Sequence, residues 1–270
     1  MRQGRKILLS LDIEEFDLPV EYGIDVPIKD QLNTGLKGLH ELAPLLTDNN
    51  KHFTLFTTAF FAENFPGEIR ALSKNHEIAS HTYYHNRFEP CHLEKSKIML
   101  ESITGQPVYG LRMPRLKAID SAIIRQAGYL YDSSINPTLI PGRYNNLFSI
   151  RTLFSENGLN RLPVSVTPRI RIPLFWLAFK NMPYNIFLKL ALRTLEHDGY
   201  VSLYFHPWEF TDLSAYKIPG YIKRGSNGKL IAKFTRLVKD LSGEGDFEKI
   251  NEFITARNIS LSGSPINALT

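Results

Sequence analysis

Residues 76–85 read His-Glu-Ile-Ala-Ser-His-Thr-Tyr-Tyr-His, and this stretch decides the fold that we expect. Its apolar pair Ile78-Ala79 is typical of the end of a buried strand, and a polar, aromatic turn with two histidines follows. On one turn of helix, side chains four residues apart lie on the same face, so His81 and His85 can converge on one metal ion. The metalloprotease signature His-Glu-x-x-His is absent, because His81 stands one residue too far from His76.

The composition is that of an ordinary globular protein. The chain has 270 residues, of which 43% are hydrophobic and 22% charged, and these values exclude disordered and collagen-like classes. Barrels of alternating strands and helices with roughly 200–250 residues often form one domain. No repeat, low-complexity tract or clear linker divides the sequence, so we expect a single domain over residues 1–270.

The charge and the sequence termini limit the partners and the compartment. A net charge of +5 is only mildly basic, and no basic helix, zinc-finger spacing or RNA-binding signature accompanies it, so we expect no nucleic-acid partner. The single cysteine, Cys91, gives no sign of an oxidising compartment. The apolar run 7–11 is too short for a signal peptide, and no run approaches the roughly 20 residues of a spanning helix. We therefore expect a cytoplasmic protein without an obligate protein partner.

Strand-like and helix-like segments alternate along the chain. We expect strands at 7–11, 53–57, 76–80, 108–111, 130–131, 162–166 and 200–205, and helices at 31–49, 66–74, 92–104, 120–127, 184–198 and 247–257. This alternation predicts a mainly parallel sheet in an α/β fold, as a barrel or a doubly wound sheet. Polar residues stand just past the carboxyl ends of several strands, which favours a barrel with its catalytic face there. They are Asp12, Glu14, His81, His85, Arg112, Asp132 and His206.

Five ordered segments resemble those of the polysaccharide deacetylases, the NodB-homology superfamily or carbohydrate esterase family four. They are 11–15 (Leu-Asp-Ile-Glu-Glu), 76–85, 111–114 (Leu-Arg-Met-Pro), 131–134 (Tyr-Asp-Ser-Ser) and 203–209 (Leu-Tyr-Phe-His-Pro-Trp-Glu). The first is similar to the branch with an Asp-x-Glu motif. The resemblance implies a distorted (β/α) barrel with fewer than eight repeats and about seven strands. It also implies a divalent metal ion, most often zinc, used to hydrolyse an acyl group on a sugar.

The resemblance assigns metal ligands and a base by position. His81 and His85 become metal ligands, and Asp12 becomes the general base. In the usual first motif, two adjacent aspartates divide the base and metal duties, but here an isoleucine follows Asp12. The metal carboxylate is therefore Glu14 or Glu15. Side chains alternate along a strand, so Asp12 and Glu14 point to the same side, which favours Glu14.

Amide hydrolysis also needs a general base held in position and a group that donates a proton to the leaving amine. We expect Arg112 to orient Asp12 and keep it ionised. We expect His206 to protonate the amine, with Asp132 holding its tautomer. By position, the resemblance implies four further residues that contact the substrate: Tyr84, Pro114, Arg115 and Trp208. At the position of Arg115 the family commonly has an aromatic residue.

These expectations predict a metal-dependent deacetylase that removes an N-acetyl group from an amino sugar. The sugar would belong to a glycan or to a lipid-linked or nucleotide-linked saccharide used to build a surface polysaccharide. The alternative is a catalytically silent barrel that binds a glycan or a protein, although such a module has no use for a base, metal ligands and an acid together. Residues 163–193 combine cations with aromatics such as Phe175 and Trp176. They either pack over the barrel as core or contact the inner face of an anionic membrane.

Overall fold

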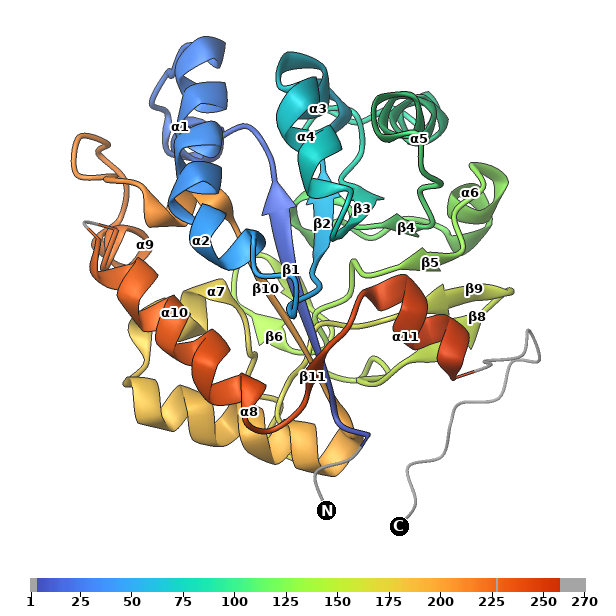
Figure 1. The fold of residues 1–270 in the computed structure, drawn as a ribbon, viewed down its shortest axis with the longest axis vertical. Coiled ribbons are helices and arrows are strands. Elements are labelled where there is room, and N and C mark those ends of the chain that lie inside the picture. Colours follow the sequence, from blue (N-terminus) through green and yellow to red (C-terminus); the bar gives the residue numbers. More distant parts are fainter. Residues whose placement is uncertain (1–3, 227, 258–270) are drawn as a thin grey trace.

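A curled, mainly parallel sheet forms the centre of this computed structural model, which describes residues 4–226 and 228–257 (Figure 1). Seven parallel strands stand in one row, and the antiparallel β8 (Phe154–Glu156) extends it. The row is β10 (Tyr200–Phe205), β1 (Lys6–Ile13), β2 (Thr54–Thr57), β3 (Glu77–Ser80), β4 (Gly110–Leu111), β5 (Tyr131–Asp132) and β9 (Leu159–Arg161). The short β11 (Asp246–Phe247) also pairs with β1, and β6 (Leu139–Ile140) and β7 (Tyr144–Asn145) form a separate hairpin. The predicted distorted (β/α) barrel is confirmed.

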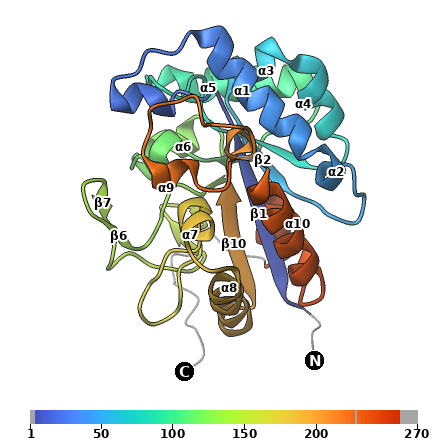
Figure 2. The ribbon, with the colours of Figure 1, turned by 90° about the vertical axis from the view of Figure 1, so that its left-hand side faces the viewer.

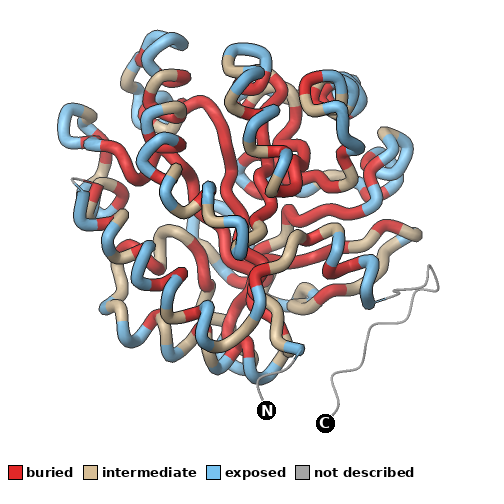
Figure 3. The backbone as a smooth tube through the Cα atoms, viewed as in Figure 1, coloured by how far each residue is buried: buried red, intermediate tan, exposed pale blue. Residues whose placement is uncertain are grey.

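Helices surround the outer side of this sheet, and Figure 2 shows α7 and α8 beside β10 with α10 next to β1. The helices are α1 (Ile28–Glu41), α2 (Ala43–Leu46), α3 (Ala59–Asn64), α4 (Pro66–Leu72), α5 (Cys91–Thr104), α6 (Ser121–Gln126), α7 (Trp176–Asn181), α8 (Tyr184–Asp198), α9 (Gly220–Lys223), α10 (Lys229–Ser242) and α11 (Ile250–Ala256). Three short 3-10 helices follow strand ends or loops: η1 (Leu18–Tyr22), η2 (Pro114–Leu116) and η3 (Pro207–Phe210). Figure 3 shows that the strands at the centre of the sheet are buried, while the helices alternate between buried and exposed positions.

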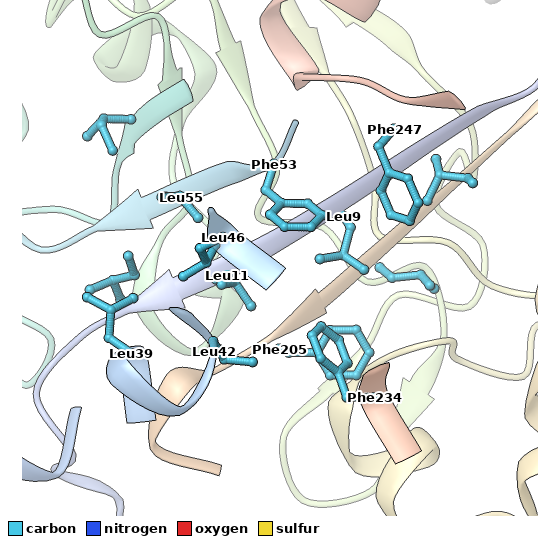
Figure 4. Packing of buried hydrophobic residues seen from close by; sticks show 14 of the residues in the cluster. Leu9, Leu11, Leu39, Leu42, Leu46, Phe53, Leu55, Phe205, Phe234 and Phe247 are labelled. Atoms are coloured by element: carbon cyan, nitrogen blue, oxygen red, sulfur yellow. The ribbon is translucent and has the colours of Figure 1, made fainter. Parts of the chain in front are cut away.

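The central strand β1 is buried on both of its faces because it lies between two packed layers. Leu9 and Leu11 point outward into the large cluster under the helices, which also holds Leu39, Phe205 and Phe234 (Figure 4). Leu8 belongs to a separate cluster with Phe56 and Ala79. Side chains of a strand alternate between its two faces. Ser10 and Asp12 therefore share the inner face with Leu8, and the strand delivers its carboxylate into the barrel.

The predicted strand at 162–166 is replaced by a less regular connection. The parallel strand pairing ends with β9. The residues that follow β9 contact β10 through individual hydrogen bonds rather than a regular series. The Ser165 backbone N–H donates to the carbonyl of Ser202 at 2.9 Å, and the Ser202 N–H donates to the Ser165 hydroxyl at 2.8 Å. Pro163 has no N–H to offer a ladder, so a continuous strand cannot form here. These bonds bring the two ends of the row together without a regular ladder between them.

Several helices differ from the predictions, and the short α3, α7 and α9 lie outside every predicted helix. The helix expected at 31–49 begins at Ile28 and divides after Glu41, because Pro44 begins a second short helix. The helix expected at 247–257 starts at Ile250, since Phe247 already belongs to β11. Helix α10 was not predicted at all. Its buried side chains recur every three or four residues, which is the ordinary signal of an amphipathic helix.

Several apolar side chains of residues 163–193 belong to the core, whereas Ile170 is 73% exposed. Leu174, Phe179 and Phe187 are fully buried, and Phe175 is only 9% exposed. Trp176 packs edge-on against the ring of His206, with 5.3 Å between ring centroids. Phe175 is thus nearly enclosed and Trp176 is half-buried, while a membrane contact through this segment stays a prediction. Within residues 4–226 and 228–257, no helix combines the length and apolar character needed to cross a bilayer.

Glu77 holds three elements together at the amino-terminal end of the barrel strands. Its carboxylate accepts hydrogen bonds from the Thr54 hydroxyl at 2.8 Å and the Tyr131 hydroxyl at 2.9 Å. It also accepts one from the backbone N–H of Asn251 at 3.1 Å, at the start of α11. Burial raises the pKa of Glu77 to about 7, although these donors favour the charged form. The carboxyl group therefore takes up a proton more readily in the folded chain than in the unfolded one.

We expect Glu77→Gln to flatten the pH dependence of stability. Because the folded pKa of about 7 lies above the ordinary value of 4.5, Glu77 stabilises the fold at low pH. That contribution, on the order of 3 kcal/mol, is lost as the pH rises from about 4.5 through 7. Urea unfolding at pH 5 and pH 8 should show a smaller difference in the variant than in wild type. The exposed Glu94→Gln is the control, and an unchanged difference in Glu77→Gln would contradict the assignment.

Candidate metal centre

Three side chains that follow β1 and β3 converge above the carboxyl ends of the strands. Glu14 Oε2 lies 3.0 Å from His81 Nε2 and 3.0 Å from His85 Nε2. Each residue offers one ligand atom, and these three atoms lie within 4.8 Å of one another. All three side chains are almost fully buried. Two imidazoles and a carboxylate are the ligand types that zinc takes in open catalytic sites.

The two histidines converge without a helix. Residues 81–85 form an irregular turn after β3, in which Thr82 has a left-handed φ of 63°. The expected helical turn is therefore wrong, although the outcome for the rings is the same. The imidazoles stack with centroids 5.5 Å apart and an interplanar angle of 27°, and both present Nε2 to Glu14.

Each ligand is fixed by a further hydrogen bond. His81 Nδ1 lies 2.8 Å from the carbonyl of Arg112, and His85 Nδ1 lies 2.7 Å from Asp17 Oδ1. Protons on the two Nδ1 atoms leave the Nε2 lone pairs free for a cation. The Trp208 indole N–H donates to Glu14 Oε1 at 2.9 Å, so the other carboxylate oxygen stays available. These bonds fit the three residues to a divalent ion.

Glu14 rather than Glu15 reaches the two histidines. Glu15 accepts a hydrogen bond from the Thr58 hydroxyl at 2.6 Å, and burial raises its pKa. Burial also acts on Glu14, but His85, His206 and His81 outweigh it and hold the pKa of Glu14 well below its ordinary value. The two carboxyl groups therefore have opposite tendencies: Glu14 favours the charged form that binds cations, and Glu15 favours the neutral form.

His85 lies between two carboxylates. Burial alone would lower its pKa, but Glu14 and Asp17 raise the pKa of His85 to about 10. A metal ion at this position would have to displace the proton from Nε2, so binding would release a proton. Asp17, which the sequence analysis did not select, is thus the residue that orients a ligand. Asp17 also pairs with Arg115 at 2.9 Å.

Asp12 lies beside the three ligands and is held by Arg112. The buried Arg112 Nη1 donates to Asp12 Oδ1 at 2.6 Å and to the Ser10 hydroxyl at 2.9 Å. The guanidinium lies over the ring of Phe56, 4.0 Å from its centroid, and 5.1 Å from that of Tyr204. The arginine and the carboxylate compensate each other's burial, and their packing leaves little freedom of movement.

His206 faces the same space from the end of β10. Its Nε2 lies 3.9 Å from Asp12 Oδ2 and 4.0 Å from Glu14 Oε1. Its Nδ1 lies 3.1 Å from Glu209 Oε1, and the same carboxylate accepts the His206 backbone N–H at 2.8 Å. The other oxygen of Glu209 is 3.3 Å from the ammonium of the buried Lys180. Burial lowers the pKa of His206, but Glu14, Glu209 and Asp12 raise it above its ordinary value.

The expected contact between Asp132 and His206 is wrong. Asp132 accepts a hydrogen bond from Arg161 Nη1 at 2.7 Å and another from the Ser134 hydroxyl. The cause is strand register, since Asp132 on β5 stands directly opposite Arg161 on β9. The orienting carboxylate is instead Glu209, three residues after His206 within the same quoted motif. That spacing was visible in the sequence, whereas nothing marked Asp17 or Lys180.

A cavity opens above these groups. Asp12, the three candidate ligands and His206 line it together with apolar side chains that include Leu18, Trp176 and Leu177. Of the four residues expected to contact substrate, Arg115 and Trp208 line this cavity, although the Trp208 N–H is already bound to Glu14. Tyr84 lines a neighbouring groove and carries Arg87 over its ring at 3.8 Å, and Pro114 lines another.

Two glycines of α1 let this helix pack closely against the backbone on both sides of the candidate metal centre. A Cβ on Gly35 would lie 2.5 Å from the carbonyl oxygen of Glu14, and one on Gly38 would lie 1.9 Å from that of Pro207. Both distances are shorter than any real contact. The helix therefore touches the backbone beside a candidate ligand and the backbone after His206, and only glycine permits this approach.

Comparisons with known proteins fit this arrangement. The polysaccharide deacetylase family model matches residues 37–131, which contain the histidine pair and Arg112. A Mycobacterium smegmatis protein assigned as a polysaccharide deacetylase superposes with a TM-score of 0.67 at 17% identity, over 99% of this chain and 96% of that chain. One from Pseudomonas aeruginosa PAO1 gives 0.65 at 17% identity, over 93% and 89%. The Puue allantoinase gives 0.65 at 15% identity, over 94% and 90%. A comparison with curated protein sequences finds no match.

The fold is that of these (β/α) barrels, since structural likeness at such low identity shows the fold alone. The family match over residues 37–131 confirms the resemblance to the polysaccharide deacetylases over that part of the chain. The matched range begins after the first motif. The Asp-x-Glu branch therefore stays a prediction.

We expect Asp17→Asn to weaken metal binding by about 10- to 100-fold, because loss of a charged partner of a ligating histidine typically costs that much. The amide oxygen can still accept the His85 Nδ1–H, so the ring keeps its place. Titration with zinc against a chromophoric chelator measures the change. His81→Ala combined with His85→Ala should lose stoichiometric metal, and the exposed Asp212→Asn should match wild type. Wild-type affinity in Asp17→Asn would show that Asp17 has no part in holding the ion.

Proposed function

We propose that the protein is a metal-dependent hydrolase consisting of one catalytic domain. In this proposal it removes an N-acyl group, namely acetyl, from an amino sugar. The sugar would be part of a glycan or of a lipid-linked or nucleotide-linked saccharide. The observation that carries this proposal is the grouping of Asp12, His206 and the three candidate ligands around one cavity. The family match over residues 37–131 supports the same reaction class.

Glu14, His81 and His85 would hold the ion, and zinc is the commonest choice for two histidines and a carboxylate. When bound, the ion supplies Lewis-acid polarisation of the acyl carbonyl and a water molecule of lowered pKa. Leu18 and Leu177 line the cavity with apolar surface, which suits the methyl end of an acetyl group.

Asp12 serves as general base in this proposal. Arg112 binds its Oδ1, so Oδ2 is the oxygen that remains to accept a proton from the attacking water. The guanidinium thereby holds the carboxylate in a fixed orientation toward the cavity. Ser10 adds a second contact that fixes the guanidinium.

His206 serves as general acid. Burial lowers the pKa of His206, but Glu14, Glu209 and Asp12 raise it above its ordinary value, which favours the protonated imidazole that a general acid needs. Glu209 binds Nδ1, so the proton on Nε2 points to the cavity and can pass to the departing amine nitrogen. Lys180 contributes a positive charge to the outer oxygen of Glu209 and thereby offsets the burial of that carboxylate.

We expect Asp12→Asn and His206→Ala each to lower turnover by about 10²- to 10⁴-fold, the usual contribution of a general base or acid. Metal content should stay near wild type, because neither side chain is a candidate ligand. Acetate release from N-acetylated sugars, nucleotide sugars and lipid-linked sugars, with zinc or cobalt added, identifies the substrate and measures the loss. Near wild-type turnover in either variant would remove the role assigned to that residue.

We expect Glu209→Gln to move the alkaline limb of the pH–rate profile to lower pH by about one unit. Loss of the carboxylate charge lowers the pKa of His206, so the acid loses its proton earlier as the pH rises. Asp132→Asn is the matched comparison and should leave the limb in place, because Asp132 pairs with Arg161. If the alkaline limb moved in Asp132→Asn and stayed in place in Glu209→Gln, Asp132 rather than Glu209 would be the carboxylate that raises the pKa of His206.

A further inference from the structure

A second groove opens directly beside the cavity of the metal centre. His85, Arg115, Arg143 and Tyr144 line both spaces, so a molecule in one can continue into the other. The groove lies between three segments: the residues after His85, the loop after β4, and the β6–β7 hairpin with the residues after it. We call it the cationic groove, because Arg87, Arg115, Lys117 and Arg143 line it and no aspartate or glutamate does.

Two of these cations have no carboxylate partner within the described part of the chain. The Arg87 guanidinium rests on the ring of Tyr84, 3.8 Å from its centroid. The Lys117 ammonium lies 5.7 Å from the ring centroid of Phe88. Both side chains are exposed. They are therefore free to turn toward a ligand without breaking an ion pair.

The other two cations are fixed. Arg115 and Arg143 both bind the carboxylate of Glu21, the latter at 2.7 Å, and Arg115 also pairs with Asp17. Arg115 has a left-handed φ of 56°, a conformation that this network holds in place. Because Asp17 also orients His85, the fixed side of the groove is joined to the candidate metal ligand by two contacts.

The excess of positive charge sets the class of ligand. Guanidinium groups match carboxylate and phosphate oxygens in two-pronged contacts, which a neutral sugar hydroxyl does not offer. Met113 and Leu116 give the groove an apolar part, and Asn86 and Asn146 add neutral polar groups. Such a mixture suits a sugar unit that carries an acidic substituent.

We propose that the cationic groove binds an anionic group, a carboxylate or a phosphate, on the saccharide unit next to the acylated sugar. The inference rests on the proposed function for the identity of the neighbouring sugar. Anion binding itself needs no turnover, so it can be measured separately. Arg87 and Lys117 provide the adjustable contacts to the anion, and Arg115 and Arg143, already paired with Glu21 and Asp17, form the fixed wall of the groove.

The test is a binding measurement on the zinc-loaded His206→Ala protein, which keeps both spaces but lacks the proposed acid. Three ligands are compared by calorimetry: a glucuronate–N-acetylglucosamine disaccharide, UDP-N-acetylglucosamine and neutral di-N-acetylchitobiose. We expect one anionic ligand to bind at least about tenfold more tightly than the neutral one at low salt, and the advantage to shrink as salt is added. Preference for the disaccharide indicates a carboxylate, and preference for the nucleotide sugar indicates a phosphate.

Charge removal in the groove provides the second arm. Arg87→Gln with Lys117→Gln should abolish the preference for the anion and leave neutral binding unchanged. Lys229→Gln with Lys239→Gln, two exposed lysines on α10, removes the same charge elsewhere and should preserve it. Equal binding of anionic and neutral ligands to the parent protein, or an anion preference that survives in Arg87→Gln with Lys117→Gln, would overturn the proposal.

The two proposals fail separately. An anion preference that depends on Arg87 and Lys117, in a protein that deacetylates no sugar of the panel, would support the groove and refute the enzyme. Deacetylation that requires Asp12 and His206, with no preference for charged sugars, would support the enzyme and refute the groove.

Discussion

Burial of the Glu14 carboxylate is the constraint on which the rest of the structure depends. An ionised carboxylate removed from water is costly unless charged or polar partners surround it. Here His81 and His85 face one oxygen, and the Trp208 indole faces the other. Those partners come from the ends of β3 and β10, so satisfying one side chain after β1 draws distant segments together. Arg112 with Asp12 and Lys180 with Glu209 solve the same problem nearby.

The strand that carries this carboxylate also builds the core. On β1 the outward side chains, among them Leu9 and Leu11, pack under the helices, and the inward ones lead from Leu8 to Asp12. A shift of one residue in register would exchange these two sets and place the carboxylate among the apolar helix contacts. The apolar packing is therefore what fixes the position of the proposed base, and stability and chemistry are set by the same alternation.

The sequence predicted the parts of the structure that repeat with a period. Most of the predicted strands and helices lie within two residues of an observed element, and the pattern of buried strands led to the barrel. Helix α10 shows the same periodic signal and was overlooked, while the strand expected at 162–166 failed because Pro163 interrupts it. At the site, the histidine spacing predicted the convergence of His81 and His85. The partner of His206 was not predicted, since strand register gives Asp132 to Arg161 and leaves Glu209 free.

The position of β10 beside β1 has a consequence for how the protein is made. The contact between Trp208 and Glu14 joins residues 194 positions apart. Pairings over such separations form slowly because a long loop must close first. Until the ribosome has added β10 and Trp208, the Glu14 carboxylate has no indole partner and its enclosure is unfinished. The growing chain thus carries this carboxylate in water through the synthesis of 194 further residues.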